Sequence, residues 1–211
     1  SAVKAGLSVV HYTMELSEHY VGARYDTVFT HIPSADLKER TEEVKHKIGS
    51  LKGQLLIKYY PPKGVTVKKL QAHIEKMVSL GNKPDLIIVD YADLLLSHSS
   101  KADSTYAEQG GVYIDLRGVG GELGIPIWTA SQANRDASNS DVVGLENMSE
   151  AYGKAQVADV VLSISRKASE KSTGGGRIFV AKNRAGRDGM LFPMQIDTSM
   201  SKFTLLNADE M

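Results

Sequence analysis

The sequence predicts an α/β protein with a mainly parallel sheet flanked by helices and antiparallel strands at the C-terminal end. Continuous apolar runs, of which DLIIVDY at 85–91 is the clearest, indicate strands covered on both faces, as in a parallel sheet. Strand and helix patterns alternate through the first two thirds of the 211 residues, and strand patterns dominate the last third. No internal repeat or domain boundary is evident, so 1–211 is expected to form a single domain.

The first half is expected to hold alternating strands and helices. The β-branched run LSVVHYTM reads as a buried strand, and Pro61 and Pro62 end the strand before them. Apolar side chains at Leu70, Ile74 and Met77 share one face of a helix. The expected strands are 7–14, 54–60 and 85–91, and the expected helices are 17–30, 35–51 and 67–80.

The second half is expected to begin with a glycine-containing helix and to end in strands. Polar loops are expected at 97–104 and 133–147, and a flexible hairpin tip at 168–176. Trp128 lies inside a predicted strand, which favours core packing over base stacking. The expected helices are about 106–123 and 149–157, and the expected strands are 126–131, 159–165, 177–182, 190–196 and 202–206.

Composition excludes several classes of protein. The 25 basic and 25 acidic residues balance, which disfavours a binder of nucleic acid over its whole surface but leaves room for a basic channel lining. There is no cysteine, hence no disulfide framework and no thiolate metal site or nucleophile. No apolar run approaches the roughly 18 residues that span a membrane, and no signal peptide is visible. The histidines lack metal-binding spacing. A cytoplasmic protein without a membrane partner is expected.

Two acids follow predicted strands. In LIIVDYADLL, Asp90 stands at the carboxyl end of a strand, where ligands of open α/β sheets bind, and an acid there can hold the water shell of a magnesium ion on nucleotide phosphates. In TMELSE, Glu15 follows the first strand and could orient and deprotonate an attacking water. The alternatives are a strand that happens to stop at an aspartate and an acid that favours a helix dipole.

An amide and two cations follow later strands. Gln132 in PIWTASQANR could sense a terminal phosphate by hydrogen bonding, or be a loop glutamine without a role. Lys182 and Arg184 in FVAKNRAGRDG are two residues apart at the end of a strand, so they point to the same side and suit an anionic partner. The alternative is a solvated basic turn. Each signal is weak alone, but their order and context agree.

Together these motifs resemble the DnaB-like replicative DNA helicases of bacteria and tailed phages, specifically their C-terminal RecA-like ATPase domain. The resemblance covers nearly the whole chain. YTMELS matches at the catalytic glutamate with Glu15, LIIVDYADLL matches the Walker B strand with Asp90, and TASQANR matches the phosphate sensor at Gln132. VAKNRAGRDG is similar to the segment with a lysine and an arginine finger, at Lys182 and Arg184. The match extends less firmly to Asn134 and Arg135. SEAYGKAQ is more similar to phage members than to bacterial ones.

The resemblance implies an ATP-driven motor that uses ATP and Mg²⁺, with Asp90 holding the metal through water. It implies single-stranded DNA and a homo-oligomeric ring, expected to be a hexamer, as partners, with primase and a helicase loader as further candidates in a bacterial or phage-infected cytoplasm. The DNA-facing region corresponds to SEAYGKAQVADVVLSISR. The residues expected at the DNA are Lys101, Ser149, Glu150 and Lys154.

One element of the family is missing from the 211 residues. No GxxxxGK(S/T) phosphate-binding loop occurs in them, and GVGGELG at 118–124 does not match one. Counting back from Glu15 places that loop just before Ser1, so a truncation before it is expected, with little activity of the fragment alone. Two alternatives stay open: a recombinase or clock-type ATPase of the same superfamily, and a ring-assembly module without turnover.

Overall fold

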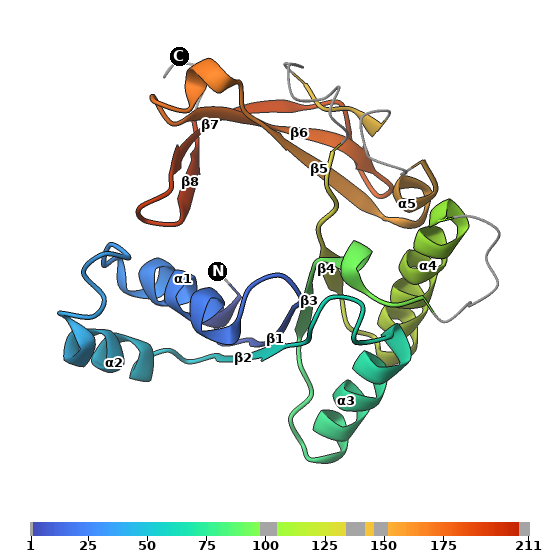
Figure 1. Cartoon of the computed structure of the whole chain (residues 1–211), viewed down its shortest axis with the longest axis horizontal. Helices are drawn as coiled ribbons and strands as arrows, with labels where there is room; N and C mark the ends of the chain where they lie inside the picture. Colours follow the sequence, from blue (N-terminus) through green and yellow to red (C-terminus); the bar gives the residue numbers. More distant parts are fainter. Residues whose placement is uncertain (1, 98–104, 134–141, 146–151, 207–211) are drawn as a thin grey trace. The chain divides into compact units, whose positions relative to one another are not determined.

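The computed structural model describes residues 2–97, 105–133, 142–145 and 152–206, with the backbone alone for 105–109 and 152. Parallel strands alternate with helices and antiparallel strands follow, so the predicted fold class is confirmed (Figure 1). The elements are β1 (Ser8–Thr13), α1 (Glu18–Thr30), α2 (Thr41–Gly49), β2 (Gln54–Tyr59), α3 (Val67–Ser79), β3 (Leu86–Asp90), α4 (Thr105–Leu123), β4 (Ile127–Thr129), α5 (Tyr152–Val157), β5 (Val160–Ser165), β6 (Gly175–Asn183), β7 (Leu191–Asp197) and β8 (Lys202–Leu205).

Packing divides the chain into two compact units, Ser1–Ala130 and Ser131–Met211. Each unit has its own four-stranded sheet, with the order β2-β1-β3-β4 in the first and β5-β6-β7-β8 in the second. A single motor domain spanning 1–211 therefore stays a prediction.

The sheet of the first unit is parallel throughout its paired strands. β1 pairs with β2 on one side and with β3 on the other, and β3 pairs with β4. Because β1 has a neighbour on each side, its apolar residues Val9, Val10 and Tyr12 are buried together with Ile87 and Val89 of β3. The continuous apolar runs read from the sequence are thus the central strands of this sheet.

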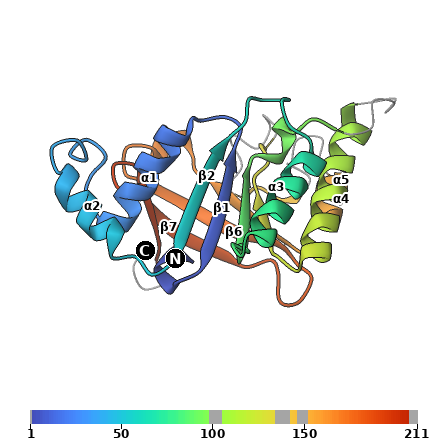
Figure 2. The same cartoon turned by 90° about the horizontal axis from the view of Figure 1, so that it is seen from below.

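Helices complete the first unit. The hydroxyl of Thr66 accepts a hydrogen bond from the Lys69 amide (3.3 Å) and caps α3, whose buried face includes Leu70 and Ile74. α3 and α4 lie next to each other in Figure 2, joined by a hydrogen bond from Gln71 to Glu122 of 2.9 Å. Among the described residues, no helix combines the length and the apolar character needed to cross a membrane.

The sheet of the second unit is antiparallel. Its register places Ile164 of β5 opposite Ile178 of β6, which in turn lies opposite Phe192 of β7. Met194 of β7 is almost completely buried. A β-bulge between Val161 and Leu162 shifts the register of β5 against β6 close to the end that carries the basic pair.

Two local expectations are wrong. The helix expected over 35–51 is confined to Thr41–Gly49, since none of the residues 35–40 is buried and a short helix depends on packing an apolar face. Trp128 was expected in the core, yet 60% of it is exposed. The reason is that β4 is the edge strand of its sheet, so a run that reads as buried has a neighbour on one side alone.

Candidate active site

A threonine turn at the end of β1 presents Glu15. The buried hydroxyl of Thr13 donates a hydrogen bond to the carbonyl of Leu16 (2.7 Å) and accepts one from its amide (3.3 Å). This closes the chain into a tight loop directly after the strand. Glu15 lies in that loop with its side chain exposed, as a residue needs to be if it is to act on a bound ligand.

The end of β3 lies beside this loop. Thr13 is in register with Asp90, and the amide of Met14 donates a hydrogen bond of 2.8 Å to the carbonyl of Asp90. The side chain of Asp90 is about one third exposed (34%). Burial, followed by the charges of Glu15, Asp93 and Asp90, raises the pKa of Tyr91, which shows that both predicted acids bear on one phenol. The structure therefore brings Glu15 and Asp90 together at the carboxyl edge of the parallel sheet.

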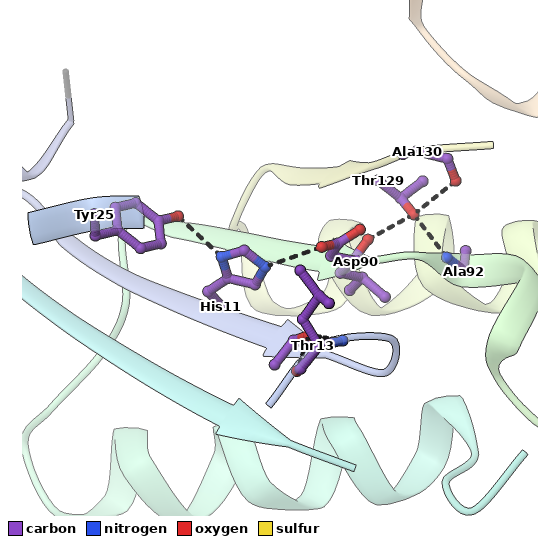
Figure 3. Close-up of polar contacts among 9 residues, drawn as sticks. His11, Thr13, Tyr25, Asp90, Ala92, Thr129 and Ala130 are labelled. Atoms are coloured by element: carbon purple, nitrogen blue, oxygen red, sulfur yellow. Dashed lines mark hydrogen bonds and ion pairs between the residues drawn. The ribbon is translucent and has the colours of Figure 1, made fainter. Parts of the chain in front are cut away.

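Side chains from β4 and α4 fasten the chain where it leaves β3. The hydroxyl of Thr129 donates to the Val89 carbonyl (2.9 Å) and accepts from the Ala92 amide (3.0 Å), as Figure 3 shows. Tyr113 of α4 donates to the carboxylate of Asp93 (2.8 Å). These bonds fix the backbone on the far side of Asp90, so the carboxylate stands on a rigid support.

Gln132 belongs to the second unit, three residues beyond the last residue of β4, and its side chain is exposed. Its placement relative to the two acids stays a prediction. Asn134 and Arg135 lie outside the described residues.

The basic pair lies at the carboxyl end of α5. Lys182 donates to the carbonyls of Ala155 (2.8 Å) and Gln156 (3.0 Å). Arg184 donates to the carbonyl of Gln156 (3.1 Å) and forms an ion pair with Asp159 (2.8 Å). The two cations thus share one side of the strand end, as their spacing predicts. They also satisfy helix-end carbonyls, where positive charge is favoured, and this structural role was not apparent from the sequence.

The residues expected at DNA are partly outside the described chain. Lys101, Ser149 and Glu150 fall in undescribed segments. Lys154 is described and is only 2% exposed, and its ammonium group donates to the hydroxyl of Ser131 (3.3 Å). In this conformation the lysine is directed into the protein, so a DNA contact would require it to leave Ser131. The DNA assignment of all four residues stays a prediction.

The first unit offers oxygen ligands of the kind that magnesium prefers. Mg²⁺ is usually held by one or two carboxylates, by phosphate oxygens and by several waters. Asp90 and Glu15 fit that requirement, since both carboxylates are accessible at one edge of the sheet. Within the described part of the chain, no three His, Asp or Glu side chains are grouped to form a metal cage of protein ligands. The geometry therefore suits a metal that arrives with phosphates.

Sequence reasoning missed a histidine and a tyrosine. His11 of β1 is buried between Asp90 and Tyr25 of α1 (Figure 3). A histidine inside an otherwise apolar strand, at the same alternation as Thr13, was the available signal. The contribution of Tyr25 depends on how α1 packs, and no local pattern announces it.

Comparison with known proteins places nearly the whole chain in one family. A family model described as the DnaB-like helicase C-terminal domain matches residues 1–204. The chain is 25% identical over 175 residues to the DnaB-like replicative helicase of Enterobacteria phage T4, an alignment covering 77% of the chain and 36% of that protein. It is 32% identical over 129 residues to a probable plasmid replicative DNA helicase of Chlamydia trachomatis, covering 59% of the chain and 27% of that protein. The chain thus spans about a third of the length of these relatives.

Solved structures show the same fold. A DnaB-like replicative helicase, whose structure was determined together with its interactions with primase, superposes with a TM-score of 0.80 at 17% identity, covering 98% of this chain and 52% of that one. An isolated ATPase domain superposes with a TM-score of 0.81 at 18% identity over 97% of this chain and 76% of that one. The RadB recombinase gives a TM-score of 0.54 at 14% identity, covering 95% and 80%. The RecA-like fold predicted from the motifs is confirmed.

Proposed function

The chain belongs to the family of DnaB-like helicase C-terminal domains, and from that premise we propose that it is part of an ATP-driven motor that translocates on single-stranded DNA and unwinds duplex DNA. Its relatives are replicative helicases. The substrate, the direction of motion and the activity of the whole protein are part of the proposal, because the chain spans 36% of one relative and 27% of another.

The observation that carries the proposal is the pair of acids at the carboxyl ends of adjacent parallel strands. Met14 and Asp90 are joined through their backbones, which holds the Glu15 loop against the end of β3. On this proposal Asp90 holds the water shell of a magnesium ion bound to ATP, and Glu15 takes a proton from the attacking water. Phosphoryl transfer depends mainly on positioning and charge, and a rigid strand edge provides positioning.

The second unit supplies the remaining groups in this proposal. Gln132 senses the terminal phosphate, and Lys182 and Arg184 reach the nucleotide of a neighbouring subunit in a ring, expected to be a hexamer. In the described chain both cations bind carbonyls at the end of α5. Engaging a phosphate would therefore mean exchanging these neutral acceptors for a charged one, which forms the stronger hydrogen bond.

Two other functions have the same fold. A recombinase or clock-type ATPase would share the acids, and the superposition on RadB shows how far the fold reaches. A ring-assembly module without turnover would also fit 211 residues that contain no phosphate-binding loop. The test between helicase and recombinase is strand separation of a forked duplex with ATP by the full-length protein. Strand exchange without unwinding would favour the recombinase.

Primase and a helicase loader are proposed as protein partners, in the cytoplasm of a bacterium or of a phage-infected host. The support for primase is the related structure, which was determined with its interactions with primase.

We expect the 211-residue chain alone to hydrolyse ATP negligibly. The residues contain no GxxxxGK(S/T) loop, so they lack the backbone cradle, the lysine and the magnesium-binding hydroxyl of such a loop. Phosphate release by the purified chain, measured beside a version that includes an upstream phosphate-binding loop, checks this. Steady turnover by the shorter chain that disappears in its Glu15→Gln variant would overturn the expectation.

We expect replacement of Lys101 and Lys154 by alanine to weaken binding of single-stranded DNA by the full-length protein. Each lost phosphate contact should also lower the slope of log affinity against log salt by about one. Because Lys154 is buried against Ser131, the single variants are measured separately, with thermal unfolding beside DNA affinity. The control is Lys83→Ala, an exposed lysine near the amino end of β3. Unchanged affinity and salt slope in the double variant would refute the placement.

A further inference from the structure

His11 is a buried histidine that lies between two functional groups. Only 8% of the residue is exposed. Its Nδ1 lies 2.9 Å from the hydroxyl of Tyr25 on α1, and its Nε2 lies 3.8 Å from Oδ2 of Asp90 (Figure 3). Nε2 is buried and has no hydrogen-bond partner among the described atoms. A buried polar nitrogen without a partner is costly in a core, so its direction toward Asp90 calls for an explanation.

Tyr25 determines which nitrogen carries the ring proton. Burial, followed by the charge of Asp90, raises the pKa of Tyr25, so its hydroxyl keeps its proton and can donate to Nδ1. Stacking on Phe29 (5.6 Å between ring centres) and an edge contact with the His11 ring (5.7 Å) hold the phenol in place. When Nδ1 accepts, a neutral imidazole has its one N–H on Nε2. That N–H then faces a carboxylate, whereas the other tautomer would direct a lone pair at negative charge.

We propose that His11 is a positioning residue for the Asp90 carboxylate, oriented by Tyr25, which restrains Oδ2 and leaves the other oxygen for the water shell of magnesium. This inference rests on the proposed role of Asp90. The distance of 3.8 Å exceeds a hydrogen bond, so the apo chain holds the two groups close but not joined. Catalytic hydrogen bonds are often long without ligand and shorten when it binds.

The arrangement also connects the two acids. Tyr25 lies on α1, and α1 begins at Glu18, three residues after Glu15. The chain from Glu15 through α1 to Tyr25, His11 and Asp90 is therefore a contact path, in addition to the backbone bond between Met14 and Asp90. A shift of α1 would change the orientation of the carboxylate as well as the position of Glu15.

The chain contains a matched control for this cluster. Tyr12, the neighbour of His11 on β1, is fully buried, and its hydroxyl lies 2.8 Å from Nδ1 of His73 on α3. This second tyrosine–histidine pair has the same chemistry without a functional acid. Tyr12→Phe and His73→Leu therefore reproduce the packing changes of Tyr25→Phe and His11→Leu away from Asp90.

The first test is independent of activity. ¹⁵N spectra of the histidine side chains of the full 211-residue chain, assigned through the His11→Gln variant, report which ring nitrogen is protonated. A proton on Nε2 of His11, lost in favour of a tautomer mixture in Tyr25→Phe, supports the inference. A proton on Nδ1 in the unsubstituted chain overturns it.

The second test measures magnesium in the full-length protein. The readout is the Mg²⁺ concentration that gives half-maximal binding of a fluorescent, non-hydrolysable ATP analogue. We expect His11→Leu to raise it roughly tenfold, which is the lower end of the effect of removing a group that orients a metal ligand. His11→Gln, whose amide can place an N–H near Nε2, should restore most of the affinity. Tyr12→Phe and His73→Leu should leave it unchanged.

The outcomes separate the inference from the proposed function. If Asp90→Asn leaves the magnesium requirement unchanged, Asp90 is not at the metal and the proposed role fails. If Asp90→Asn raises the requirement while His11→Leu and Tyr25→Phe do not, His11 is a core histidine and only the present inference fails. Should His11→Leu not fold, His11→Gln and Tyr25→Phe still decide between these results.

Discussion

Glu15→Gln in the full-length protein should abolish ATP turnover and leave nucleotide binding nearly intact. The substitution keeps the size of the side chain and removes its ability to accept a proton. General base catalysis contributes about 10²- to 10⁴-fold to a rate, so the loss should be of that order. Binding should persist because Glu15 is exposed at the tip of its loop, and the Thr13–Leu16 hydrogen bonds that form the loop do not involve its side chain. Phosphate release and nucleotide affinity, measured on the same material, check both parts.

A second glutamate provides the control. Glu18 begins α1, and its carboxylate accepts a hydrogen bond of 2.9 Å from the Tyr59 amide at the end of β2. Glu18→Gln keeps an acceptor for that amide and changes the charge by the same amount close to the site. It should therefore retain turnover. Equal losses in both variants would mean that negative charge in this region matters in general and that Glu15 is not a specific base.

The convergence of Glu15 and Asp90 was predictable because it follows from topology. Carboxyl ends of parallel strands meet at one edge of a sheet, and the apolar runs before both acids mark central strands. Strand positions were recovered for the same reason. A run that must be covered on two faces has few polar residues, and the signal survives without knowledge of the neighbours.

The parts that depended on neighbours were not predictable. Nothing local announces that Tyr25 of one helix would meet His11 of one strand, since this contact depends on how α1 packs. Lys182 and Arg184 read as a phosphate-binding pair, but the carbonyls they satisfy at the end of α5 are visible only in three dimensions. Trp128 was misplaced because a sequence shows an apolar strand and does not show whether that strand is an edge.

Arg184→Ala should abolish turnover in the full-length protein while sparing nucleotide binding, if Arg184 serves the neighbouring subunit as proposed. An arginine finger stabilises charge that develops on the transferred phosphoryl group and is worth about a thousandfold or more. The fold should tolerate the change. Arg184 and Asp159 are 48% and 59% exposed at their side chains, and such surface ion pairs contribute roughly 0.2–1 kcal/mol. A loss of turnover could then not be ascribed to unfolding, which thermal unfolding of the variant checks.

Two controls isolate the guanidinium. Asp159→Asn breaks the same ion pair but keeps Arg184, and it should retain turnover. Arg187→Ala removes another exposed arginine from the same turn and should be equally harmless. Loss of activity in Asp159→Asn would show that the turn must be held in place and would leave no specific role for the cation.

The decisive experiment is complementation between subunits. Rings that mix Arg184→Ala with Glu15→Gln subunits contain some interfaces at which an intact Glu15 faces an intact Arg184 from the next subunit. A finger acting across the interface requires that these interfaces turn over ATP, so the mixture should regain activity that neither variant has alone. A finger acting within its own subunit predicts no such recovery, because every subunit then carries a defect in its own site. If rings shown by mass spectrometry to contain both variants stay inactive, Arg184 does not act in trans, and the cation is left with its bond to Asp159 and the end of α5.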